Sequence, residues 1–208
     1  MSANTEEARE IGSYRTLRRI VGGLGMVFPI VLSLWGFALC GCAAIEPSLS
    51  DYYRLRTRDA FVGILFTIAL FLFSYRGYER KDEVAGKLAC FSALGVALFP
   101  VTGAPWEKVI HFSSATALFL VLAYFALFLF TISGGAPTPQ KLMRNGVYRA
   151  CGGTILACIL LICLYNVLWR RPSVTAYDPV FWLEAIALWA FGISWFIKGE
   201  TLLKDVAT

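Results

Sequence analysis

The single histidine of the chain, His111, is the side chain best suited to proton transfer, because imidazole titrates near neutral pH. Ser114 follows it by three positions, which places both side chains on one face of a helix. Asp59 and Glu184 supply carboxylates that could orient the imidazole. These residue types are the nucleophile, base and orienting acid of acyl transfer, so an enzyme would be expected to use His111, Glu184, Asp59 and Ser114. No local motif in the sequence brings the four together.

Glu184 is an unusual ionisable residue, because it lies inside an apolar stretch, six positions after Asp178. At the helical rise this separation is about 9 Å, so the carboxylate is expected below a membrane surface rather than on it. An ionisable side chain at that depth is costly, and it usually faces the bundle interior at a paired or functional site. We therefore predict a polar pocket near Glu184. The residues assigned to it as ligand-binding are Tyr52, Tyr53, Arg58, Asp59, His111, Ser114, Asn166 and Glu184.

The same residues also fit a purely structural interpretation. Glu184 would then pair with Arg58 or His111 as a polar link between helices. The aromatic residues nearby would form a belt at the membrane interface. The members of that belt would be Tyr52, Tyr53, Trp106 and Trp182.

Metal and cofactor chemistry has little support in the sequence. A catalytic zinc usually takes three protein ligands, whereas the chain holds one histidine. The six cysteines lie within or at the ends of apolar stretches, where a thiol usually serves as a small packing group. No glycine-rich phosphate loop and no basic surface typical of nucleic-acid binding is present. We expect no metal, no cofactor and no nucleic-acid partner.

The elements that would position these residues are six apolar stretches, most of them near the ~20 residues that an upright membrane-spanning helix needs. They are Ile20 to Ile45, Ala60 to Tyr75, Leu88 to Val101, Val109 to Ile132, Tyr148 to Trp169 and Pro179 to Ile197. A hydrophobic fraction of 58% with 16% charged residues is outside the usual range of soluble domains. The sequence predicts an all-α, polytopic membrane bundle of six transmembrane helices.

The basic residues predict the orientation of this bundle. Counted by loop, 13 of the 19 Lys and Arg residues fall on the side that holds both termini, and six fall on the other side. By the positive-inside rule, both termini are expected to be cytoplasmic. The expected organisation is a cytoplasmic N-terminal segment at residues 1–19, a six-helix transmembrane domain at 20–198, and a cytoplasmic tail at 199–208.

The third stretch is predicted to pack closely against its neighbours. Ala85, Ala89, Ala93 and Ala97 recur at intervals of four, which lines one helix face with small side chains. Small residues let helix backbones approach, and this is a main source of helix association in lipid. We expect this helix to be central in the bundle.

Several short patterns carry a resemblance that covers most of the chain. They are Pro47-Ser-Leu-Ser50-Asp-Tyr52-Tyr53, Arg58-Asp59, Tyr75-Arg76-Gly77-Tyr78, Ala97-Leu98-Phe99-Pro100, His111, Ser194-Trp195 and Lys198-Gly199. In these patterns the chain resembles a family of uncharacterised six-span bacterial inner-membrane proteins, which share a domain of unknown function. The resemblance implies a multi-pass protein of the bacterial inner membrane, and it implies no activity.

Three functions remain open from the sequence. The first is a sensor or transporter whose outward-facing polar pocket binds a lipid headgroup or small solute. The second is an intramembrane hydrolase that uses His111, which requires a serine within hydrogen-bond reach of the imidazole. The third is a structural or partner-binding subunit. The expected partners are membrane lipids, a second copy of the chain or another membrane protein.

Overall fold

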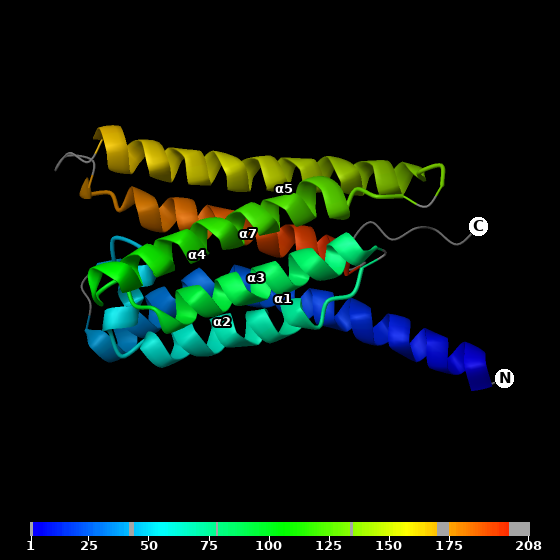
Figure 1. Ribbon diagram of the computed structural model, residues 1–208, viewed down its shortest axis with the longest axis horizontal. Helices are drawn as coiled ribbons and strands as arrows, with labels where there is room; N and C mark the ends of the chain where they lie inside the picture. The colour runs from blue at the N-terminus through cyan, green and yellow to red at the C-terminus, as the bar shows by residue number, and fades with distance from the viewer. Residues whose placement is uncertain (1, 42–43, 78, 134, 170–174, 200–208) are drawn as a thin grey trace.

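The computed structural model describes residues 2–41, 44–77, 79–133, 135–169 and 175–199 (Figure 1). Helices make up 82% of it, and no strand occurs in these ranges, so the all-α prediction is confirmed. The long helices are α1 (Ser2–Cys40), α2 (Arg58–Phe73), α3 (Arg80–Leu98), α4 (Pro105–Tyr124), α5 (Pro139–Leu164) and α7 (Pro179–Lys198). Three short elements accompany them: the 3₁₀-helix η1 (Leu49–Arg54) and the π-helical turns η2 (Phe125–Leu129) and η3 (Tyr165–Trp169).

The six long helices pack as a closed ring. Each helix from α1 to α5 contacts the next long helix along the chain, and α7 closes the ring against α1. Figure 1 shows the helices running along a common axis, with the first turns of α1 extending beyond the bundle. The described start of α1 and the end of α7 lie at one end, because Arg19 Nε donates a hydrogen bond to the carbonyl oxygen of Gly199 (3.0 Å). We call this the α7-terminal end, and we call the opposite end, which holds η1, the η1 end.

Among the described residues, four helices are long and apolar enough to cross a membrane. Their spans are Gly12–Leu39, Pro105–Leu129, Pro139–Leu168 and Pro179–Lys198. The predicted second and third spans correspond to α2 and α3, which fall outside this group. α2 has 16 residues, about 24 Å at the helical rise against a hydrocarbon core of ~30 Å. The first turn of α3 carries four charged residues, from Arg80 to Glu83.

Close approach of small residues holds the ring together at two places. Between α1 and α7, a Cβ placed on Gly22 would lie 2.7 Å from the carbonyl oxygen of Gly192. On α3, the four alanines at intervals of four are all buried, as the packing prediction requires. α3 is not central, however, because it holds one place in the ring, between α2 and α4.

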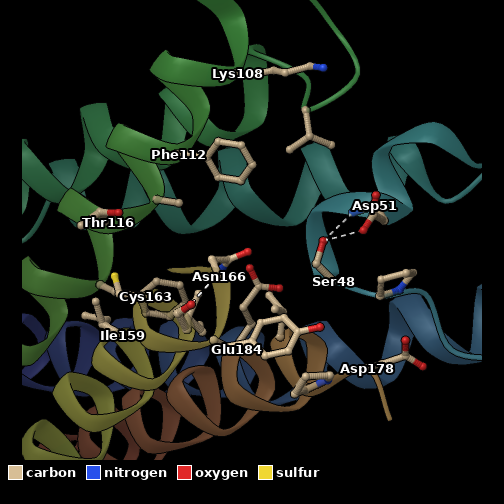
Figure 2. Close-up of a pocket in the computed structure, with 18 of the residues that line it drawn as sticks. Ser48, Asp51, Lys108, Phe112, Thr116, Ile159, Cys163, Asn166, Asp178 and Glu184 are labelled. Carbon is tan, nitrogen blue, oxygen red and sulfur yellow. Dashed lines mark hydrogen bonds between the residues drawn. The ribbon is translucent and has the colours of Figure 1, made fainter. Parts of the chain in front are cut away.

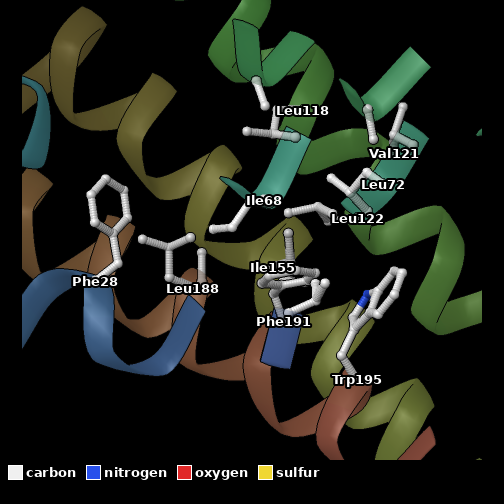
Figure 3. Packing of buried hydrophobic residues seen from close by; sticks show 14 of the residues in the cluster. Phe28, Ile68, Leu72, Leu118, Val121, Leu122, Ile155, Leu188, Phe191 and Trp195 are labelled. Atoms are coloured by element: carbon white, nitrogen blue, oxygen red, sulfur yellow. The ribbon is translucent and has the colours of Figure 1, made fainter. Parts of the chain in front are cut away.

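The interior of the ring is filled by large apolar side chains (Figure 3). Phe28 and Leu188 lie toward the left of that view, Phe191 and Ile155 lie near its centre, and Trp195 lies to their lower right. Trp195 is fully buried and contacts Phe191 with ring centroids 5.7 Å apart. The interior therefore separates the two ends of the bundle, and each end carries its own group of polar residues.

The predicted N-terminal segment, residues 1–19, is not separate from the first span. From Ser2 onward it is the beginning of α1, which runs to Cys40 without a break despite Pro29. The predicted tail, residues 199–208, lies outside the described residues except for Gly199.

Candidate functional site

A cleft of about 880 Å³ opens at the η1 end of the bundle, between α4 on one side and α5 and α7 on the other (Figure 2). Its polar lining residues are Ser48, Asp51, Arg54, Thr102, Lys108, Thr116, Tyr165, Asn166, Thr175, Asp178 and Glu184. Its apolar and thiol lining residues are Pro47, Val101, Phe112, Ala115, Phe119, Ile159, Ile162, Cys163, Pro179 and Val180.

The cleft is polar at its mouth and apolar along the helices. The charged residues come from the η1 segment, the start of α4 and the start of α7. Deeper along α4 and α5 the lining is mostly apolar, with Ala115 and Phe119 from α4 and Ile159 and Ile162 from α5, beside Thr116. One open space therefore offers hydrogen-bonding groups at one end and hydrocarbon at the other, which is the polarity of an amphiphile.

The segment that carries η1 is fixed across the start of α7. The first N–H groups of a helix have no partner within it, and the Phe181 N–H donates to the Pro47 carbonyl oxygen (3.1 Å). Glu184, one turn further along, accepts a hydrogen bond from the Leu49 N–H at Oε2 (2.7 Å). These two bonds hold Ser48 and Asp51 at the mouth of the cleft.

Glu184 is half-buried and lines the cleft. In the described structure its hydrogen bond is to the Leu49 backbone. The pairing with Arg58 or His111 expected for a polar link between helices is not among its described contacts. A charge-assisted bond to one N–H leaves acceptor capacity on the carboxylate, which points into the cleft beside Asn166 (Figure 2).

His111 lies inside the bundle and links three elements. Its Nδ1 is 2.6 Å from the carbonyl oxygen of Phe99, just after α3, and its Nε2 is 2.8 Å from Ser50 Oγ in η1. A carbonyl oxygen only accepts, so Nδ1 carries the proton. Nε2 of the neutral ring then accepts from the Ser50 hydroxyl. This is the arrangement of a serine nucleophile and its base, with a backbone carbonyl in the place of the orienting carboxylate.

The Ser50–His111 pair is closed to solvent in this structure. His111 is fully buried, Ser50 is 7% exposed, and neither lines the cleft. The backbone N–H groups on either side of Ser50 are already used, since Leu49 donates to Glu184 and Asp51 donates to Ser48. An oxyanion would therefore find neither of these donors free. In this conformation the pair anchors η1 to α4.

The eight residues assigned to the predicted pocket divide between different places. Asn166 and Glu184 line the cleft. Tyr53 and Arg58 line a second, shallower pocket of about 710 Å³, where the Arg58 guanidinium lies 5.0 Å from the centroid of the Tyr53 ring. Asp59 is exposed in the first turn of α2 and lines neither pocket.

The remaining three residues of that set lie in the packed interior or at helix contacts. Tyr52 is buried, with its ring centroid 6.2 Å from that of Phe181. His111 is occupied by Ser50 and Phe99, as described above. Ser114 lies against α3, where its Oγ would be 2.2 Å from a Cβ on Gly95. The serine within hydrogen-bond reach of His111 is therefore Ser50 and not Ser114.

Several residues of the cleft were not assigned from the sequence. Ser48 and Asp51 belong to the polar segment after the first span but read as ordinary loop residues, and Lys108 follows a helix start. The structure adds one local feature at the cleft: its wall at Tyr165 and Asn166 is the π-helical turn η3, and such turns occur often at functional sites. The residue types of this turn do not predict it from the sequence.

The described ranges contain no cluster of side chains suited to bind a metal ion. No group of three or more His, Cys, Asp or Glu side chains gathers there. Cys90, Cys151 and Cys158 are buried free thiols, as expected of packing residues, whereas the exposed Cys163 lines the cleft.

Comparisons with known proteins bear on neither fold nor function. No protein family, no curated protein and no solved structure matches the chain. The resemblance to six-span bacterial proteins therefore stays an expectation, and the function has to be argued from the cleft itself.

Proposed function

We propose that the protein is an integral membrane protein that binds an amphiphile in the cleft at the η1 end, as a sensor or a transporter. The observation that carries this proposal is the polarity of the cleft, charged at the mouth and apolar along α4 and α5. A lipid would place its headgroup beside Glu184 and Asn166 and its acyl chain along Ala115 and Ile159. Ligand sites with a mostly apolar wall and a few placed polar groups are the usual form of small-molecule pockets.

The charges at the mouth favour a headgroup that carries both signs. Lys108 is exposed, while Asp178 and Glu184 are half-buried carboxylates. Arg54 is already paired with Glu46 (3.2 Å) and Asp51 (3.1 Å). A zwitterionic headgroup would meet a carboxylate with its cationic part and Lys108 with its anionic part.

The binding proposal is tested by Glu184→Gln. Glutamine keeps the shape and an oxygen that accepts from Leu49 N–H, so the fold should persist while the charge is lost. We expect the purified protein to retain co-purifying lipid, measured by mass spectrometry, and Glu184→Gln to lose most of it. Asp59→Asn is the matched control, because it removes an exposed carboxylate outside the cleft. Equal lipid content in both variants would refute the proposal and favour a structural subunit.

We further propose that all six long helices cross the membrane, with both ends of the chain in the cytoplasm and the cleft facing outward, as in a bacterial inner membrane. This is supported by the ring of antiparallel helices, by the shared end of α1 and α7, and by the 13 to six distribution of basic residues. α2 and α3 would span with local thinning of the bilayer. With the native cysteines replaced by serine, because the exposed Cys163 lines the cleft, a cysteine added at Thr208 should react with impermeant reagents only from the cytoplasmic side. Reaction from the outside would reverse the topology.

A second function, an intramembrane hydrolase, is favoured by one observation, the 2.8 Å contact between Ser50 Oγ and His111 Nε2. Ser50 Oγ would bond to an ester carbonyl carbon while His111 takes the hydroxyl proton and returns it to the leaving alcohol, and water would then release the acid. Movement of η1 would have to open the pair. A fluorophosphonate probe should label the wild-type protein and not Ser50→Ala. Absence of labelling in both would exclude this function.

A further inference from the structure

Two rows of side chains, one on each of two neighbouring helices, form the walls of the cleft. Residues three or four positions apart lie on one face of a helix, so each row is a single helix face. The row on α4 is Lys108, Phe112, Ala115, Thr116 and Phe119, and the row on α5 and η3 is Ile159, Ile162, Cys163 and Asn166. Because α4 and α5 are neighbours in the ring, the space between these rows is a gap in the wall of the bundle. We call it the α4–α5 gap.

The two helices meet at the inner end of the gap and separate toward the η1 end (Figure 1). One turn past Phe119, a Cβ on Gly152 of α5 would lie 3.2 Å from the Ala123 carbonyl oxygen of α4. The helix backbones are therefore close at this point, and the gap ends there. On the η1 side of this contact, the same helices line the cleft of about 880 Å³.

The side chains along the gap are open to the outside of the bundle. Phe112 is 58% exposed, and Thr116 and Cys163 are exposed as well. All three belong to helices that are long and apolar enough to cross a membrane. A gap on the side of two such helices faces lipid, because water meets a membrane bundle at its two ends.

The gap extends to the depth of one bilayer leaflet. The two candidate spans are Pro105–Leu129 and Pro139–Leu168. Phe119 lies 14 positions after Pro105, about 21 Å at the helical rise, and Ile159 lies nine positions before Leu168, about 14 Å. One leaflet contributes about 15 Å to the hydrocarbon core. The apolar walls therefore lie at the level of acyl chains, and the polar mouth of the cleft lies at the level of headgroups.

We propose that the ligand of the cleft is a phospholipid of the surrounding leaflet, which enters sideways through the α4–α5 gap. This inference rests on the proposed function and adds the source and the route of the ligand. A lipid that moves sideways brings its headgroup to Glu184 and its chains to Ala115 and Ile159, and the chains remain in apolar surroundings throughout. A route through water would expose the chains, which lowers the population of the moving lipid roughly fourfold for each methylene exposed.

The test closes the gap with a covalent bridge. Figure 2 shows Thr116 of α4 across the cleft from Cys163 of α5, so Thr116→Cys gives a thiol on each wall. Bismaleimides with a series of spacer lengths are used to join the two thiols, and the joined peptides are identified by mass spectrometry. Cys40 and Cys42 are replaced by serine, and Cys90, Cys151 and Cys158 are buried. The full chain is placed in nanodiscs that contain deuterated dioleoyl phosphatidylethanolamine, and the lipid that stays bound after detergent extraction is measured.

The bridge should block movement of the lipid in both directions. When it is formed before the labelled lipid is supplied, loading should be lost. When it is formed after loading, the lipid should be retained through a delipidating wash. The control is the same variant modified at both thiols with N-ethylmaleimide, which adds similar groups but leaves the helices unjoined, and this protein should release its lipid in the wash.

The outcomes separate the route from the binding site. Equal release of lipid by the bridged protein and the control overturns the lateral route, and it leaves the proposed function standing if the bound lipid still depends on Glu184. Absence of Glu184-dependent lipid in the unbridged protein overturns both. Failure of every spacer to join the two thiols would show that they do not face one gap, and it overturns the lateral route as well.

Two neighbouring residues on α5 test the route without a cross-link. Ile159 lines the gap, whereas Leu160 is exposed and does not line the cleft. Ile159→Trp places a large ring in the gap and should slow the exchange of bound lipid with the nanodisc. Leu160→Trp adds the same ring outside the gap and should exchange lipid as the wild type does. Equal exchange rates in the two variants would overturn the proposal.

Discussion

The contact between α1 and α7 can be tested with two neighbouring glycines. A Cβ on Gly22 would lie 2.7 Å from the Gly192 carbonyl oxygen and 2.9 Å from the Phe196 backbone nitrogen. Both obstacles are backbone atoms, so they cannot rotate away, and α1 and α7 would have to separate. Gly23, the next residue, has nothing within 4 Å of its added Cβ.

The two variants Gly22→Ala and Gly23→Ala share every effect except this contact. Each replaces a glycine inside α1, which gains about 0.5 to 1 kcal/mol of helix propensity. Overpacking at Gly22 costs about 1 to 3 kcal/mol in addition. The free energy of unfolding of Gly22→Ala should therefore lie about 2 kcal/mol below that of Gly23→Ala, or roughly 4 to 8 °C in Tm for a chain of this size.

Thermal unfolding of both purified variants in one detergent measures this difference. Gly23→Ala should match or exceed the wild-type Tm, and Gly22→Ala should fall below it. Equal Tm values for the two variants, at or above the wild-type value, would refute the argument, because they would mean that α1 and α7 do not approach at Gly22. An equal loss of Tm in both variants would also refute it, and would point to a role for glycine flexibility in α1.

Two further predictions concern buried contacts. Ala93→Leu should destabilise the bundle by about 1 to 3 kcal/mol, since Ala93 is fully buried on the alanine face of α3, and an unchanged Tm in detergent would mean that this face meets lipid. Ser50→Ala should cost about 1 to 3 kcal/mol by leaving His111 Nε2 buried without a donor, whereas Ser113→Ala, at an exposed position, should cost little in the same unfolding assay. Equal losses in the two serine variants would contradict the anchoring role of Ser50.

Some residues of the cleft could be predicted from the sequence before the fold was known. Glu184 stood out because a carboxylate inside an apolar stretch is costly, and it does line the cleft. Tyr52 and Ser114 stood out by residue type and proximity in sequence, but both are used in packing. Polarity along a helix shows that a side chain needs a polar partner, and it does not show which neighbour supplies that partner.

The sequence by itself determined the all-α class and the close packing of the alanine face, and of the six spans that it predicted, four are described helices long and apolar enough to cross a membrane. These properties depend on local composition and on periodicity along one helix, and both can be read directly from the amino-acid sequence. The lengths of α2 and α3 also follow from local composition, because the apolar stretches in these two segments are short.

Tertiary structure alone decided which residues meet. Ser50 reaches His111 across 61 positions, and Leu49 reaches Glu184 across 135 positions. Arg18, Arg144 and Lys198 come from α1, α5 and α7, and these basic side chains come near one another only because α7 packs against both α1 and α5. Such pairs depend on the order and rotation of helices around the ring, because a helix presents a different side chain to each neighbour. Hydropathy records how apolar a segment is, and the direction in which each side chain faces emerges only from the packing of all six helices.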